Sequence, residues 1–208
     1  MSIFSKISFK DQAFKLRESA VLDATTKILG DKGFDLMTMD DVANAVGISK
    51  PSLYKHFKSK EDLVGEALIR LIDGAIEFMA ALDQNLDPVQ KLSDLLEWAL
   101  RVRLQGGLPF LPSTNASVRS MLMRNVRYVT RILKLNAQLE KLVQTAQKNG
   151  DLDDRLPSDV ILFSYYSRTC DPAVEYLQQF SKMKEDEIVD AMLQVAFQGF
   201  RPDEKQSR

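Results

Sequence analysis

The chain has 208 residues and carries 28 Lys and Arg against 29 Asp and Glu, a formal net charge of −1 at pH 7. Hydrophobic residues at 45% and charged residues at 27% are typical of a globular protein. One His and one Cys leave too few ligands for a zinc site and restrict histidine-dependent catalysis to His56. We therefore expect no metal, no cofactor and no enzyme.

No apolar stretch approaches the ~20 residues of a membrane span. The N-terminal segment is interrupted by charged residues and lacks the apolar core of a signal peptide. A single Cys cannot form an internal disulfide and fits a reducing compartment. These features predict a cytoplasmic protein with no membrane partner.

Apolar residues recur at helical spacing along the chain, and no convincing strand pattern of alternating residues is present. Glycines and prolines fall between the periodic segments. Gly33 ends a first helix, Pro88 opens a later one, and Gly150 ends a long one. A Gly- and Pro-rich break covers residues 105–112. The sequence predicts an all-α protein of about nine helices.

Residues 38–62 have the pattern of two short helices joined by a glycine turn. Thr38, followed by Asp41 three residues later, is a capping box that opens the first of them. Gly47 stands where this helix must end, and Ser49 is a suitable N-cap for the second. The segment therefore predicts a helix-turn-helix.

The second helix of such a motif normally enters the major groove of DNA. The charge of the segment agrees, because the stretch from Val42 to Lys60 contains four lysines and no acidic residue. Lys and hydroxyl side chains at helix N-termini suit contacts with phosphates. A further capping box, Ser59 with Asp62, predicts a long helix that starts at Lys60.

Residues from roughly 17 to 63 resemble the DNA-binding domain of the tetracycline-repressor (TetR) family of bacterial transcription regulators. The resembling residues are Thr38-Met39, Val42-Ala43, Val46-Gly47-Ile48-Ser49, Ser52-Leu53-Tyr54-Lys55-His56-Phe57 and Lys58-Ser59-Lys60-Glu61-Asp62-Leu63. The resemblance implies an N-terminal helix-turn-helix domain over residues 1–63 and a C-terminal ligand-binding and dimerisation domain over residues 64–208. It also implies a homodimeric repressor that binds a palindromic operator and is released by a small-molecule effector.

The resemblance implies DNA contacts for nine residues: Thr38, Ser49, Lys50, Pro51, Ser52, Tyr54, Lys55, His56 and Lys60. Thr38, Tyr54 and Lys60 are expected at phosphates, and His56 is expected at the backbone edge of the groove. Lys50 and Lys55 are the candidates for sequence discrimination, since Lys can donate to O6 and N7 of guanine. The alternatives are a core position for Tyr54 and simple solvation of Lys58 and Lys60.

The helices expected from about 158 to 181 and from 185 to 200 resemble the four-helix dimer interface of the family. The residues expected there are Val160, Ile161, Phe163, Ile188, Val189, Met192, Leu193, Ala196 and Phe197. The alternative is that these side chains form core within one chain. Pro172 predicts a kink in the first of these helices.

Aromatic and Met residues near the break at 105–112 are candidates for a ligand pocket, because pockets are mostly apolar with a few polar groups. The candidates are Trp98, Arg101, Leu104, Phe110, Met121, Arg124, Tyr128, Tyr165 and Tyr166. Ordinary helix core is the alternative for the apolar members. Cys170 is a further open position, either a buried inert thiol or a redox sensor.

A basic stripe runs from Arg119 to Lys134, with Arg124, Arg127 and Arg131 on one helix face. The expected core side of that helix is formed by Leu122, Val126, Val129 and Leu133. The stripe is either a solvated face or a site for an anionic effector or an acidic partner.

The leading hypothesis is a ligand-responsive DNA-binding repressor. One alternative keeps the same DNA-binding domain with a C-terminal domain that binds a protein partner, and another is an activator. An enzyme would need a catalytic constellation, and the sequence contains no second His and no Gly-rich phosphate loop. Lys6, Lys10 and Lys15 belong either to an arm that touches DNA or to a disordered tail.

Overall fold

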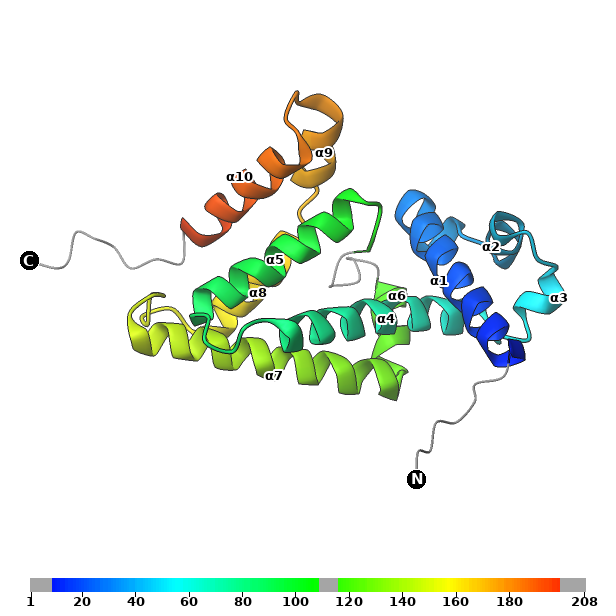
Figure 1. Cartoon of the computed structure of the whole chain (residues 1–208), viewed down its shortest axis with the longest axis horizontal. Coiled ribbons are helices and arrows are strands. Elements are labelled where there is room, and N and C mark those ends of the chain that lie inside the picture. Colours follow the sequence, from blue (N-terminus) through cyan, green and yellow to red (C-terminus); the bar gives the residue numbers. More distant parts are fainter. Residues whose placement is uncertain (1–8, 109–115, 199–208) are drawn as a thin grey trace, which may run out of the picture. The chain divides into compact units, whose positions relative to one another are not determined.

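The computed structural model describes residues 9–108 and 116–198, whose regular elements are ten helices and no strands (Figure 1). The helices are α1 (Phe9–Leu36), α2 (Met39–Val46), α3 (Lys50–Leu53), α4 (Lys60–Ala81), α5 (Pro88–Leu104), α6 (Ala116–Arg124), α7 (Val126–Asn149), α8 (Ser158–Thr169), α9 (Ala173–Phe180) and α10 (Glu185–Gln198). The all-α prediction is confirmed. None of the described helices has the length and apolarity needed to span a membrane.

Two breaks divide helices that the sequence pattern merges. Asn125 ends α6, and its side chain accepts a hydrogen bond of 3.1 Å from the Tyr128 N–H as the N-cap of α7. Cys170 and Asp171 separate α8 from α9, directly before Pro172. Because proline disfavours helical backbone at the preceding residue and donates no hydrogen bond, the kink expected at Pro172 is a complete break.

The chain divides into two compact units, Met1–Ala67 and Leu68–Arg208. α4 contributes to both units, because it begins at Lys60 and ends at Ala81. The functional division expected after residue 63 stays a prediction.

In the N-terminal unit, α1, α2 and α3 each contribute buried side chains to one core, among them Val21, Val42 and Leu53. Gly33 interrupts the helical backbone of α1 with φ of 75° and ψ of 170°. Glycine adopts positive φ without the steric penalty of a Cβ atom, which explains the predicted helix end at this position. Met37 is buried between this interruption and the start of α2.

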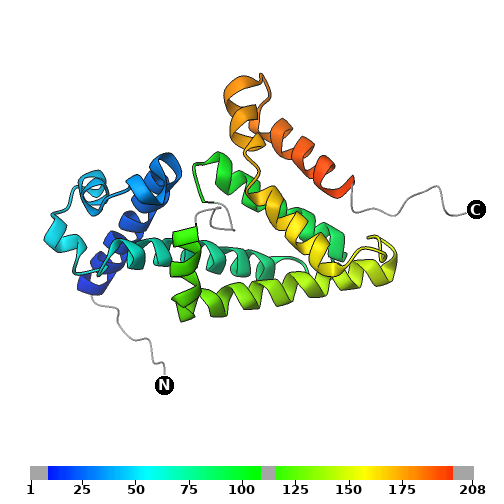
Figure 2. The same cartoon turned by 180° about the vertical axis from the view of Figure 1, so that it is seen from behind.

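In the C-terminal unit, α5 contacts α7, α8, α9 and α10 (Figure 2). The leucines of α5 are buried in the core of this unit. Arg103, near the end of α5, binds residues on both sides of the break between α8 and α9. Its Nη1 donates to the Thr169 carbonyl oxygen at 2.6 Å, and its guanidinium pairs with Glu175 of α9. The last carbonyl groups of a helix have no hydrogen-bond partner within it, and the Arg103 guanidinium supplies one for Thr169 at the end of α8.

The core face of α7 differs from the predicted one. Leu122 is buried as expected, but Val126 is 77% exposed and Leu133 is 61% exposed. The buried side chains of α7 are Tyr128, Leu135, Leu139, Val143 and Ala146. The prediction for this face was wrong because Asn125 starts a new helix, so the apolar spacing does not continue in phase from α6 into α7.

Candidate nucleic-acid interface

The turn between α2 and α3 is built by the capping residues that the sequence predicts. Thr38 Oγ1 accepts from the Asp41 N–H at 3.1 Å, and Asp41 Oδ2 accepts from the Thr38 N–H at 2.9 Å. Gly47 ends α2 in the left-handed region, with φ of 73° and ψ of 32°. Ser49 Oγ then accepts from the Ser52 N–H at 3.3 Å and starts α3. The predicted helix-turn-helix is confirmed.

α3 contains only four residues, and turn hydrogen bonds extend it as far as Phe57. The His56 and Phe57 amides both donate to the Leu53 carbonyl oxygen, at 2.9 and 3.0 Å. Leu53 and Phe57 are buried in the unit and hold this segment in place. The helix is shorter than the sequence pattern indicates, but the predicted buried pair is present.

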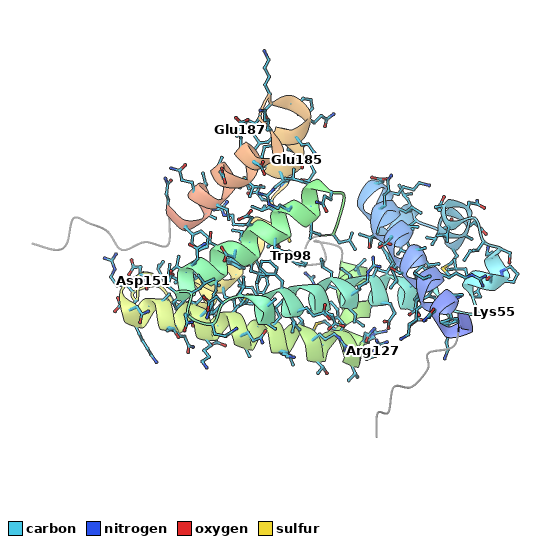
Figure 3. The ribbon with its side chains drawn as sticks, in the orientation of Figure 1. Lys55, Trp98, Arg127, Asp151, Glu185 and Glu187 are labelled. Atoms are coloured by element: carbon cyan, nitrogen blue, oxygen red, sulfur yellow. The ribbon has the colours of Figure 1, made fainter. Side chains whose placement is uncertain are left out.

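This anchoring leaves the opposite side of the segment exposed. Lys50, Pro51 and Lys55 are exposed, Tyr54 is 45% exposed, and Ser52 is half-buried. Figure 3 shows Lys55 at the outer side of the N-terminal unit. A core position for Tyr54 is excluded by its exposure. Six of the nine expected DNA-contacting residues thus lie between Lys50 and Phe57, and four of the six are exposed.

The two lysines of this segment differ in their electrostatic environment. Lys50 Nζ lies 2.7 Å from Asp40 Oδ2, and this ion pair raises the pKa of Lys50. Lys55 makes no ion pair within residues 9–108 and 116–198. Asp40 carries no motif signal in the sequence and was not among the expected site residues.

Thr38 and Lys60, both expected at phosphates, are engaged within the unit. Lys60 Nζ donates to the Phe34 carbonyl oxygen at 2.9 Å and lies 4.4 Å from the centroid of the Phe34 ring. Thr38 Oγ1 donates to Asp41 Oδ2 at 2.8 Å. The hydrogen bonds from Lys32 and Thr38 lower the pKa of Asp41 to about 2. Phosphate contacts by Thr38 and Lys60 therefore stay predictions.

His56 lies between aromatic rings. Its ring stacks on Phe14 of α1 with 4.1 Å between centroids, and its centroid is 6.3 Å from that of Phe57. Its Nδ1 is buried and has no hydrogen-bond partner in the described part of the chain. Phe14 lies outside the recognised motif, and no spacing rule predicts this contact. A DNA contact by His56 remains a prediction.

The candidate ligand residues fall into three groups, and Phe110 lies outside the described residues. Three tyrosines, Tyr128, Tyr165 and Tyr166, are buried. The Tyr165 hydroxyl donates to the Leu92 carbonyl oxygen at 2.9 Å, and the Tyr166 hydroxyl donates to Asn136 Oδ1 at 2.5 Å. Burial raises the pKa of Tyr128 to about 12.

Trp98 forms a second group with residues of α4. Its ring stacks on Phe78 with centroids 5.8 Å apart, and a Cβ atom at Gly74 would lie 3.4 Å from Trp98 Cζ2 (Figure 3). Leu104 is buried and Met121 is half-buried, as in ordinary helix core.

The charged candidates are not brought into one site with the tyrosines. Arg101 pairs with Glu97 at 2.9 Å and with Asp186 at 2.8 Å on the surface. Arg124 is exposed. Arg131 donates to Asp73 of α4 at 2.7 Å, so the basic stripe is not uniformly solvated.

The nine expected dimer residues differ in burial, and their place in a dimer interface stays a prediction. Six of them are buried within the chain itself: Ile161, Ile188, Val189, Met192, Ala196 and Phe197. Leu193 is half-buried, while Val160 is 51% exposed and Phe163 is 58% exposed. An open groove of about 430 Å³ on α8 is lined by Asp159, Val160, Phe163, Ser164 and Ser167. Spacing identifies apolar helices but not which apolar face lies inward.

Residues 21–67 match the sequence model of the family described as "Bacterial regulatory proteins, tetR family". The chain is 35% identical over 80 residues to the HTH-type transcriptional repressor KstR2 of Mycolicibacterium smegmatis, covering 38% of this chain and 39% of that protein. It is 34% identical over 82 residues to the HTH-type transcriptional activator FasR of the same organism, covering 39% of this chain and 37% of that protein. The chain thus aligns with less than half the length of these relatives.

The fold extends the likeness over most of the chain. A crystal structure of the transcriptional regulator FadR from Bacillus subtilis in complex with stearoyl-CoA superposes with a TM-score of 0.61 at 14% sequence identity. The superposition covers 88% of this chain and 99% of that one. At this identity the likeness concerns the fold.

Proposed function

We propose that the chain is a DNA-binding transcription regulator of the tetR family. In this proposal it is a repressor that binds a palindromic operator as a homodimer and leaves it when a small molecule binds. One observation carries the DNA-binding part of the proposal. The buried Leu53 and Phe57 fix a short segment whose opposite side exposes lysine, proline and tyrosine side chains. Such a segment fits a major groove.

Within this interface, Lys55 is the leading candidate for base recognition. Its ammonium group has no intramolecular ion pair among the described residues and can donate to guanine O6 and N7. Tyr54 supplies a hydroxyl for a phosphate contact. Lys50 reads bases as well, but it must first exchange its ion pair with Asp40 for a contact with DNA.

A homodimer would match an operator with two-fold symmetry. Its two DNA-reading segments would lie about one helical turn of DNA apart, ~34–36 Å. The exposed side of α8 supports a contact between two chains. Val160 and Phe163 lie there beside small serine side chains that allow close approach. The six expected dimer residues that are buried within one chain would not touch the partner. They would contribute by packing α8 and α10 into their own unit.

The effector part of the proposal rests on the C-terminal unit. Its buried tyrosines provide polar hydroxyls within an apolar environment, which is the composition of many ligand sites. Since the FadR structure contains stearoyl-CoA, acyl-CoA thioesters are the first compounds to test. An effector can release the protein only if it prefers a conformation that binds the operator poorly.

KstR2 is named as a repressor and FasR as an activator, so the sign of regulation needs its own experiment. Genomic fragments selected by the purified chain would give the operator, and transcription from that promoter in vitro would give the sign. The proposal expects a two-fold symmetric site, two chains per site and reduced transcription. Enrichment of no sequence would contradict DNA recognition, whereas increased transcription would contradict repression alone.

Effector release can then be measured on the recovered operator. Stearoyl-CoA and shorter acyl-CoA thioesters are added to the complex, with free coenzyme A as the control. Release by an acyl-CoA but not by coenzyme A supports a ligand-responsive regulator. If no compound releases the protein while a protein co-purifies with its C-terminal unit, the protein-partner alternative is favoured.

A further inference from the structure

α7 has a second apolar face in addition to the one that forms the core. Val126 and Leu133 are 77% and 61% exposed, and Thr130 and Ala137 are exposed as well. These four residues are separated by four, three and four positions, which places them in one line along the helix. We call this line, Val126, Thr130, Leu133 and Ala137, the outer seam.

The outer seam lies on the side of α7 away from the core. At 100° per residue, Leu133 is about 160° from Leu135 and about 120° from Leu139, both of which are buried. Among the described helices, α7 packs mainly against α5, α6 and α8, and Arg131 joins it to α4 through Asp73. Figures 1 and 2 both show α7 at the lower margin of the C-terminal unit, with no other described helix of that unit beneath it.

A column of positive charge runs along one flank of the outer seam. Arg127, Lys134, Lys141 and Lys148 follow one another at intervals of seven residues, and all four are exposed. Arg131 does not belong to this column, because it points to Asp73 of α4. A line of small and apolar residues with charges repeated every seven positions is the pattern of a helix that packs against another helix.

The polar group at the centre of the outer seam already has a hydrogen-bond partner, so a docked helix could bury it. The Thr130 hydroxyl donates to the Val126 carbonyl oxygen of its own helix at 2.8 Å. Thr130 can therefore be covered by an apolar side chain without loss of a hydrogen bond. Ala137 has no side chain beyond Cβ and allows close approach of a neighbouring helix.

We propose that the outer seam and its basic column form a docking site for an amphipathic helix of another protein that carries acidic residues on its flank. A second copy of this chain is not a suitable partner for the outer seam, because two α7 helices packed antiparallel would bring the positive charges of their basic columns together. The seam also differs from a membrane-binding face, since it is narrow and carries no aromatic residue. Charge complementarity selects an acidic partner.

The test uses the full chain and a labelled synthetic helix of three heptads, with Leu at both seam-facing positions and Glu at the flanking positions. Binding is followed by fluorescence anisotropy without DNA, so that failure is separable from failure of the proposed DNA-binding function. Leu133→Gln and Lys134→Glu are each expected to weaken binding by about fivefold or more. Val195→Gln on α10 and Lys182→Glu, both at exposed positions, serve as matched controls.

Three outcomes would overturn the proposal. The first is equal binding of the peptide by wild type, Leu133→Gln and Lys134→Glu, or equal binding of a peptide with Lys in place of Glu. The second is binding of phosphatidylserine vesicles that depends on Lys134, without binding of the peptide. The third is loss of a two-chain assembly in Leu133→Gln, measured by sedimentation, which would assign the seam to a second copy.

Discussion

Asp40 Oδ2 lies 2.7 Å from Lys50 Nζ, and this ion pair links the first residue of α3 to the first turn of α2. Both side chains are largely exposed, so the pair adds little to the stability of the fold. Its effect falls on DNA binding instead. A carboxylate beside a proposed base-reading lysine reduces the attraction of that lysine for any phosphate.

Asp40→Asn is therefore expected to strengthen binding to DNA of unrelated sequence more than binding to the operator. The freed Lys50 gains a phosphate contact, and the slope of log K against log salt becomes steeper by about 0.9. Fluorescence anisotropy at several salt concentrations measures both quantities. In a Lys50→Met background the effect of Asp40→Asn should disappear, and its persistence there would assign it to general charge rather than to the pair.

Lys55→Ala is expected to weaken operator binding and to relax its sequence preference, by about 1–3 kcal/mol at the base pair that it reads. Lys58→Ala provides a matched control, since Lys58 is an exposed lysine close by in the sequence. Competition assays with single-base operator variants measure the preference. A uniform loss of affinity over all variants would contradict base reading by Lys55 and indicate a phosphate contact.

Lys60→Met separates two roles for that lysine. The structure shows a hydrogen bond to the Phe34 carbonyl and a contact with its ring, so a loss of about 1 kcal/mol in unfolding free energy is expected. Chemical denaturation measures it. A phosphate contact would add a second effect, a decrease of about 0.9 in the salt slope of operator binding. An unchanged slope would restrict Lys60 to a structural role.

Leu53→Ala should unfold or loosen the reading segment, because a fully buried leucine is lost from the core of the N-terminal unit. The expected cost is about 2–5 kcal/mol of unfolding free energy. Thermal unfolding followed by circular dichroism measures it, with Leu36→Ala, at an exposed position, as the control. Equal stability of the two variants would contradict the anchoring role.

The capping box makes the N-terminal unit sensitive to acid. The pKa of Asp41 is lowered from 3.8 to about 2 in the folded chain, so the contribution of its carboxylate is complete above the unfolded value. It is lost as pH falls from about 4 towards 2. Asp41→Asn should flatten the stability profile in this window, which urea unfolding at a series of pH values measures. An unchanged slope would show that other carboxylates cause the acid sensitivity.

The sequence predicts the local features of the DNA-binding segment well, for a physical reason. Thr38, Asp41 and Ser49 act on backbone amides within three residues, and Gly47 acts on its own dihedral angles. Such signals need no knowledge of the rest of the chain. The all-α fold follows from helical periodicity in the same way.

Contacts between distant segments were not predictable in the same way. The stacking of His56 on Phe14 and the pairing of Lys60 with Phe34 join residues far apart in the sequence. Whether an apolar residue faces core or solvent depends on the phase of its helix relative to its neighbours. That phase places Ile161 inside and Phe163 outside on the same helix.

The shortness of α3 has a thermodynamic consequence for DNA binding. A four-residue helix has almost no internal hydrogen-bond cooperativity, and the buried Leu53 and Phe57 are the main apolar anchors of the segment. Amides of residues 54–57 should therefore exchange with solvent rapidly in the free protein and slowly in the complex. Ordering of this segment on the operator would make the enthalpy of association strongly dependent on temperature, a heat-capacity signature that a preformed long recognition helix would not produce.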